Sequence, residues 1–153
     1  MSPKTSDQIA SRVVIVSGGS NGIGAAVVAG FNRQGAIVII VDLLSMESSA
    51  RKVIESLSFP SNAGFMPADI TDWDQIREVF RTVHLEFGCI DLVIANAGTM
   101  EHQPTFEDTF DENGELEAPT EAYRTIDVNL KGSLNSTSLS ALVESHDGSD
   151  HSA

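Results

Sequence analysis

The feature that most constrains the fold of this chain is a glycine-rich turn that joins a short β-branched run to a helical pattern. The run is Val13 to Val16, and the turn over residues 17–24 reads Ser-Gly-Gly-Ser-Asn-Gly-Ile-Gly. Glycines at 18, 22 and 24 give the spacing G-x-x-x-G-x-G. A strand that enters a helix through such a turn brings backbone N–H groups close to any bound diphosphate. A plain tight turn is the other interpretation.

Apolar runs and helical patterns alternate along the rest of the chain. Strands are expected at 13–16, 36–41, 64–68 and 92–95. Helices are expected between the glycine-rich turn and Gly35, at 45–57, at 71–87, and from Thr120 to about Val143. This β-α-β-α-β-α-β-loop-α order is typical of an α/β fold with a parallel sheet and helices on both faces. We expect the strand order 3-2-1-4, with the site where the carboxyl ends of strands 1 and 4 meet.

The third helix has the clearest sequence signals. Thr71 is expected to be its N-cap, with Asp74 as the capping-box partner, and Gly88 is expected to end it. Its apolar face is predicted to contain Trp73, Ile76, Phe80, Val83 and Phe87. This spacing indicates core packing rather than a ligand site.

Asp42 ends the second expected strand, about 20 residues after the glycine-rich turn. A carboxylate at this place accepts hydrogen bonds from the hydroxyls of an adenosine ribose, and a helix cap or a loop charge is the alternative. A 2′-phosphate would bring a like charge against this carboxylate, so Asp42 favours NAD(H) over NADP(H).

Composition narrows the function classes. The chain has 153 residues and a net charge of −13, which disfavours nucleic acid and anionic membranes as partners. Its one cysteine, Cys89, cannot form an internal disulfide, and no apolar run is long enough to cross a membrane, so we expect a cytoplasmic protein. The acidic stretch between Arg81 and Arg124 is interpreted as a solvated loop, with a metal site or a docking surface for a basic partner as alternatives.

Four motifs occur in succession: the glycine-rich turn at 17–24, Asp69-Ile70, Asn96-Ala97-Gly98, and Asp-Val-Asn-Leu-Lys-Gly at 127–132. Together they resemble the signatures of the short-chain dehydrogenase/reductase family, over residues 11–142. The resemblance implies a partial, doubly wound Rossmann fold of about four parallel strands over 12–143. It also implies an oxidoreductase that transfers hydride between a nicotinamide dinucleotide and an alcohol or ketone.

The resemblance also assigns roles to single residues. Gly18, Gly22, Ile23 and Gly24 would wrap the diphosphate, and the neighbouring Ser17, Ser20 and Asn21 would also belong to the cofactor site. Asp42 would hold the adenosine ribose, while Asp69 and Ile70 would flank the adenine. Asn96, Ala97 and Gly98 would lie on the nicotinamide side. Asn129 matches the family's helix asparagine, which anchors a water in a proton relay. Lys131 is either close to the cofactor or simply solvated. No metal ligand set is expected.

The chain departs from the family pattern in its catalytic residues. The family uses a serine and a Tyr-x-x-x-Lys motif, all after the helix asparagine. The single tyrosine here, Tyr123, precedes Asn129 and has Asp127 four residues on. The sequence is therefore interpreted as truncated before these residues, and the isolated chain is expected to be inactive.

Alternative hypotheses are a non-catalytic dinucleotide-binding or interaction protein, and a truncated or mis-spliced product without an independent role. Residues 1–11 and 144–153 are polar and are expected to be unstructured. Self-association is expected through the last helix and through the outer edge of the fourth strand, because nothing in the sequence pairs with that edge.

Overall fold

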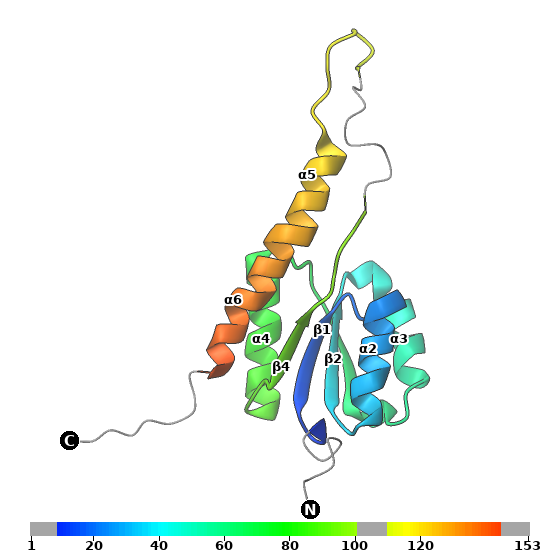
Figure 1. Ribbon diagram of the computed structural model, residues 1–153, viewed down its shortest axis with the longest axis vertical. Helices are drawn as coiled ribbons and strands as arrows, with labels where there is room; N and C mark the ends of the chain where they lie inside the picture. The colour runs from blue at the N-terminus through cyan, green and yellow to red at the C-terminus, as the bar shows by residue number, and fades with distance from the viewer. Residues whose placement is uncertain (1–8, 101–109, 145–153) are drawn as a thin grey trace, which may run out of the picture.

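The computed structural model describes residues 9–100 and 110–144, with side chains described as far as Leu139. Most of the two segments that were expected to be unstructured, and much of the acidic stretch, lie outside these residues. The sheet contains β1 (Val13–Ser17), β2 (Ile37–Asp42), β3 (Ala63–Pro67) and β4 (Leu92–Ala95). All of its pairings are parallel, in the order β3-β2-β1-β4 (Figure 1). The predicted strands and their order are confirmed.

Helices cover both faces of the sheet. One face carries α2 (Gly22–Arg33) and α3 (Glu47–Glu55), which follows a 3-10 turn at Leu44–Met46. The other carries α4 (Trp73–Phe87) and α6 (Ser133–Glu144). A second 3-10 turn, Pro60–Asn62, leads into β3. The alternation of side chains along each strand divides the core into two layers, one on each face of the sheet.

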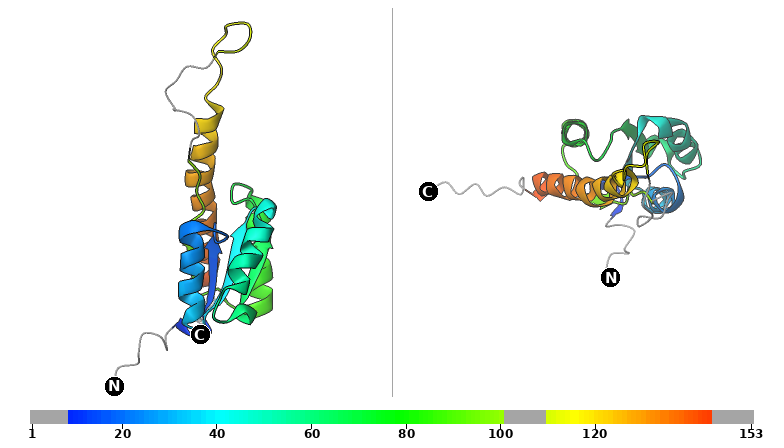
Figure 2. Two further views of the ribbon diagram at one scale, coloured as in Figure 1. Left: turned by 90° about the vertical axis from the view of Figure 1, so that its right-hand side faces the viewer. Right: turned by 90° about the horizontal axis from the view of Figure 1, so that it is seen from above.

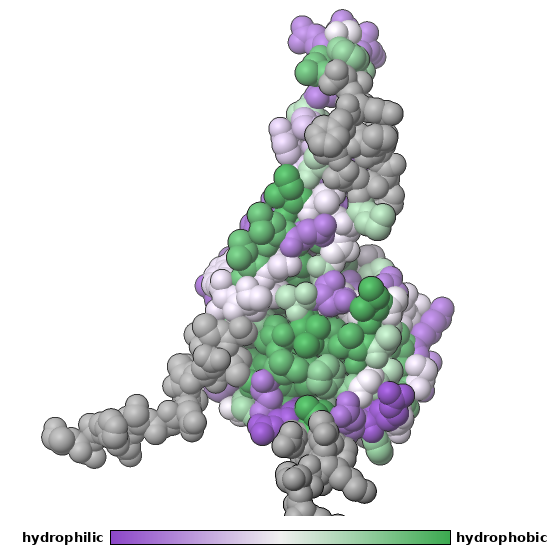
Figure 3. Space-filling model, viewed as in Figure 1, coloured by the Kyte–Doolittle hydropathy of each residue, from purple (hydrophilic) through white to green (hydrophobic). Residues whose placement is uncertain are grey.

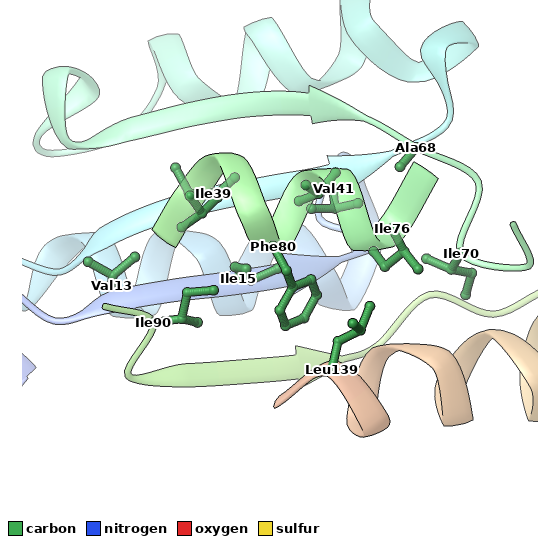
Figure 4. Packing of buried hydrophobic residues seen from close by; sticks show 12 residues of the cluster. Val13, Ile15, Ile39, Val41, Ala68, Ile70, Ile76, Phe80, Ile90 and Leu139 are labelled. Carbon is green, nitrogen blue, oxygen red and sulfur yellow. The ribbon is translucent and has the colours of Figure 1, made fainter. Parts of the chain in front are cut away.

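The layer under α4 and α6 is packed around Phe80. Its ring lies between Ile15 of β1 and Leu139 of α6 (Figure 4). The opposite layer joins Val14 and Val16 of β1 to α2 and α3. β1 and β2 are buried on both faces of the sheet, which explains why their predicted runs are continuously apolar.

Two details of the predicted helices are wrong. The N-cap of α4 is Asp72 and not Thr71: its carboxylate accepts from the N–H groups of Asp74 and Gln75, while Thr71 donates instead to Asp69. Trp73 does not belong to the buried face, because it is the first residue of α4 and is 42% exposed.

The last helical segment is one continuous rod with a change of winding in its middle. It consists of α5 (Thr120–Ile126), a π-helical turn (Asp127–Gly132) and α6. Only its second half lies beside β4, and α5 projects beyond the carboxyl ends of the strands (Figures 1 and 2). π-Helical turns inside α-helices are frequent at functional sites. In this chain the turn contains Asn129.

Candidate functional site

The glycine-rich turn is packed so tightly that two of its residues have no room for a side chain. A Cβ on Gly24 would lie 2.0 Å from the carbonyl oxygen of Gly18. A Cβ on Gly18 would lie 2.7 Å from Cα of Ala97, and its φ of +66° also favours glycine. The turn is therefore pressed against the segment that follows β4.

The same packing leaves the N-terminus of α2 open. The first N–H of the helix to find a partner belongs to Ala25, which donates to the carbonyl of Asn21. The N–H groups of Gly22, Ile23 and Gly24 come before it, and the side chain of Asn21 caps none of them. A Cβ built on Gly22 meets no atom within 4 Å. Bare helix donors beside open space suit a phosphate group.

Ser17 fastens β1 to β4 at this point. Its buried hydroxyl accepts from the N–H groups of Asn96 and Ala97, at 3.1 and 3.2 Å. The side-chain amide of Asn96 returns across the gap and donates to the carbonyls of Ser17 and Gly18. Ser17 and Asn96 thus hold the strand ends in register below the cleft.

Asp42 lies at the end of β2, beside the turn. One carboxylate oxygen accepts from the N–H of Ser20 at 3.2 Å and the other from the N–H of Leu43 at 2.9 Å. The hydroxyl of Ser20 is buried and has no hydrogen-bond partner among the described residues. At this end of the site the carboxylate of Asp42, which lines the cleft, is therefore the group that can accept a hydrogen bond from a ligand.

The loop after β3 is shaped by its own hydrogen bonds. Asp69 accepts from both the N–H and the hydroxyl of Thr71, each at 2.8 Å, through the same carboxylate oxygen. Ile70 is buried against Gly132 of the last helix, where a Cβ would come within 2.4 Å of its Cδ1. Asn135 completes the contact by donating to the carbonyl of Ile70 at 2.9 Å.

The loop after β4 is clamped by Asn129. The N–H of Thr99 donates to the side-chain oxygen of Asn129 at 2.8 Å, and the side-chain amide donates back to the Thr99 carbonyl at 2.9 Å. Asn129 therefore uses both of its polar atoms to fix the chain immediately after Gly98.

These elements surround one cleft of about 730 Å³, which is within the range of cofactor sites. Most of the expected site residues line it: Gly18, Asn21, Ile23, Gly24, Asp42, Asp69, Ile70, Asn96, Ala97 and Gly98. Ser17, Ser20, Gly22, Asn129 and Lys131 are outside this lining. Lys131 is exposed, and its charge adds to the hydrogen bonds from Gln75 that lower the pKa of Asp72.

The last helix contributes a wall that was not expected from the sequence. Thr120, Tyr123, Arg124, Asp127 and Val128 all line the cleft. Thr120, Arg124 and Val128 are spaced four residues apart and so share one helix face. That spacing was visible in the sequence, but nothing there indicated that α5 would stand over the strand ends.

None of the helices in residues 9–100 and 110–144 combines the length and the apolar character that a membrane span needs. The described ranges also contain no group of three or more metal-ligating side chains.

A parallel sheet with a glycine-rich turn and a cleft at its carboxyl edge defines a dinucleotide-binding α/β protein. Residues 12–149 match the family model for the short chain dehydrogenases. The chain belongs to the short-chain dehydrogenase/reductase family of oxidoreductases, whose members bind a nicotinamide dinucleotide.

Curated relatives agree with this assignment. The short-chain dehydrogenase/reductase prx4 of Penicillium rubens is 40% identical over 128 residues, which are 84% of this chain and 35% of that protein. The 3-hydroxyacyl-CoA dehydrogenase type-2 of Drosophila melanogaster is 33% identical over 134 residues, 87% of this chain and 49% of that protein. The chain thus spans between about a third and a half of the length of these relatives.

Solved structures are similar as well. The crystal structure of gox2181 matches with a TM-score of 0.70 and 27% identity, over 88% of this chain and 49% of that one. A short-chain type dehydrogenase/reductase from Mycobacterium marinum matches with a TM-score of 0.75 over 88% of this chain and 51% of that one, at 23% identity, and shows the fold alone.

Proposed function

We propose that this chain binds NAD(H) and forms the dinucleotide-binding half of an oxidoreductase that acts on an alcohol or ketone. The observation that carries the proposal is the bare N-terminus of α2 above a turn in which Gly24 has no room for a Cβ. Such donors are suited to a diphosphate that the backbone can approach closely. The bound nicotinamide would supply or accept the hydride.

The cleft fits the other parts of a dinucleotide in a definite order. Asp42, which lines the cleft, would hold the adenosine ribose. Asp69 and Ile70 would flank the adenine, since Ile70 offers an apolar contact and the second carboxylate oxygen of Asp69 accepts no hydrogen bond from the described residues. Ala97 and Gly98, fixed by Asn96 and Asn129, would lie under the nicotinamide.

The preference for NAD(H) rests on Asp42. Its carboxylate is held by two backbone N–H groups beside the cleft, where a 2′-phosphate would add a like charge. Titration of NADH and NADPH into the chain and into Asp42→Ala tests this. We expect NADH to bind about tenfold more tightly than NADPH, and the difference to narrow in Asp42→Ala. Equal affinity in the unmodified chain would contradict the preference and leave dinucleotide binding intact.

We expect that these 153 residues alone do not catalyse the oxidation of alcohols or the reduction of ketones. The one tyrosine, Tyr123, has Asp127 rather than lysine four residues on, so the sequence has no Tyr-x-x-x-Lys motif. Loss of a positioned acid or base typically reduces the rate by about 10²–10⁴-fold. NADH oxidation with a panel of ketones should therefore stay near the uncatalysed rate. Sustained turnover that Asn129→Ala abolishes would contradict this.

Two further expectations belong to the same proposal. The single cysteine, Cys89, supports a reducing compartment, and we place the protein in the cytoplasm. The last helix exposes an apolar stripe of Ile126, Leu130 and Leu134, and this stripe and the outer edge of β4 support self-association. No partner besides the dinucleotide and a second copy of the chain is proposed.

A further inference from the structure

The charges around the cleft are unbalanced for an anionic ligand. Three carboxylates line it, those of Asp42, Asp69 and Asp127. Among the described residues of the lining, the one cation is Arg124 of α5. The whole chain carries a net charge of −13, so nothing at long range offsets the local excess of negative charge.

Arg124 has no competing partner in the described ranges. The arginines at 12, 51, 77 and 81 each pair with a carboxylate, whereas the structure gives Arg124 no such pair. Its side chain is exposed, and it shares the cleft-facing side of the helix with Thr120 and Val128. An arginine held beside a cleft without an ion pair is available to a ligand.

A dinucleotide presents the chemistry that such an arginine recognises. The diphosphate carries two negative charges close together, and the planar guanidinium can donate two parallel hydrogen bonds to phosphate oxygens. The bare N–H groups of Ile23 and Gly24, which line the cleft, and of the neighbouring Gly22 would approach the diphosphate from the sheet side. The α5 wall offers a cation from the other side.

We propose that Arg124 is a cofactor-binding residue that donates to the diphosphate of the bound dinucleotide. It clamps the cofactor from the helix while the N-terminus of α2 holds it from the sheet. The inference rests on the proposed function, because it assumes that a dinucleotide occupies the cleft. It adds a binding residue outside the four sequence motifs.

Calorimetric titration of NADH, ADP and adenosine into the full chain and its variants tests the assignment. Arg124→Gln should lower the affinity for NADH and for ADP about tenfold, since one charge-assisted contact is lost. The affinity for adenosine should not change. Arg124→Lys keeps the charge but not the planar guanidinium. Its affinity for NADH and ADP should therefore lie between that of the unmodified chain and that of Arg124→Gln. Arg33→Gln is the matched control, because Arg33 is also exposed and lies outside the cleft lining.

The affinities of the variants test the role of Arg124, whereas the affinity of the unmodified chain tests dinucleotide binding itself. Unchanged NADH affinity in Arg124→Gln overturns the inference alone. An equal loss in Arg33→Gln overturns it too, because the effect would then be one of overall charge. An equal loss for adenosine assigns Arg124 to the adenine instead of the diphosphate. Failure of the folded, unmodified chain to bind NADH, ADP or adenosine overturns the proposed function itself.

Discussion

Gly24 shows how a single missing side chain sets the geometry of the cleft. The atom that a Cβ would meet is a backbone oxygen, that of Gly18, at 2.0 Å. A backbone atom in a turn that is itself pinned by Ser17 and Asn96 cannot move away cheaply. The tight turn and the binding site are therefore the same feature.

Gly24→Ala should lower the free energy of unfolding by about 2–3 kcal/mol and weaken NADH binding, because the turn must open to admit the methyl group. Gly30→Ala on the same helix is the control. Nothing lies within 4 Å of a Cβ there, so the helix should gain about 0.5–1 kcal/mol. Chemical denaturation of both variants checks the pair. Equal stability of the two would mean that the turn is not close-packed.

Asp91 couples the start of β1 to the start of β4. It accepts from the N–H of Val13 at 2.8 Å and pairs with Arg12. Burial alone would raise the pKa of Asp91, but these hydrogen bonds and the charge of Arg12 outweigh it and hold the pKa below its ordinary value. A lowered pKa in the folded state stabilises the protein above the unfolded pKa and is lost as the pH falls through the folded pKa.

Asp91→Asn should therefore lower the free energy of unfolding at neutral pH by about 1–2 kcal/mol. The difference from the unmodified chain should shrink once the pH falls below about 4. Denaturation curves across this pH range measure it. Asp74→Asn removes an exposed i,i+3 pair with Arg77 and should change stability by less than about 0.5 kcal/mol. If the two chains differed in free energy of unfolding by the same amount at all pH values, ionisation of the Asp91 carboxylate would be excluded as the cause of the difference.

At the scale of elements, the last helix acts as a brace for two loops. Asn129 clamps the loop after β4 through Thr99, and Asn135 holds the loop after β3 through Ile70. Gly132 lets the helix come close enough for the second contact. Both loops line the cleft, so the helix sets the position of its floor and of one wall.

Asn129→Ala should increase hydrogen exchange at the amide of Thr99, because that N–H loses its acceptor, and should cost about 1 kcal/mol of stability. Asn135→Ala is the matched change. It removes a bond to the carbonyl of Ile70 and should leave the Thr99 amide protected. Equal exchange at Thr99 in the two variants would mean that the asparagines act only through overall stability.

The sequence was sufficient to predict the elements and not their junctions. Apolar runs alternate with helical patterns along the chain, so β1 to β4 could be predicted with their order. The N-cap of α4 was misplaced by one residue because Thr71 and Asp72 are adjacent and both suit a cap. Arg124 was missed because its role depends on where α5 stands relative to the strand ends, which no local pattern encodes.

At the scale of the whole molecule, two apolar surfaces remain uncovered. Ile126, Leu130 and Leu134 of the last helix are each more than half exposed. β4 is an edge strand in this sheet, and its Leu92 is 38% exposed. Figure 3 shows an apolar stripe along the helix and a second apolar area over the strands. Each large apolar side chain left in water forgoes roughly 1.5–3 kcal/mol of burial.

We expect the chain to self-associate at micromolar concentration, and the double variant Leu130→Glu with Leu134→Glu to shift it toward the monomer. Leu85→Glu on α4 is the control, because Leu85 is 70% exposed and belongs neither to the last helix nor to β4. Sedimentation velocity distinguishes the species. A concentration-independent monomer in the unmodified chain would exclude association through these surfaces.

The central claim, that this chain binds a nicotinamide dinucleotide at the glycine-rich turn, is tested most directly by hydrogen exchange with and without saturating NADH. With NADH bound, we expect slower exchange at the amides of Gly22, Ile23 and Gly24, which have no partner in the helix. Exchange should also slow at the amides of Ala97 and Gly98 across the cleft. Exchange in α3 should not change. Unaltered exchange at the three α2 amides in a folded chain at saturating NADH would contradict the claim.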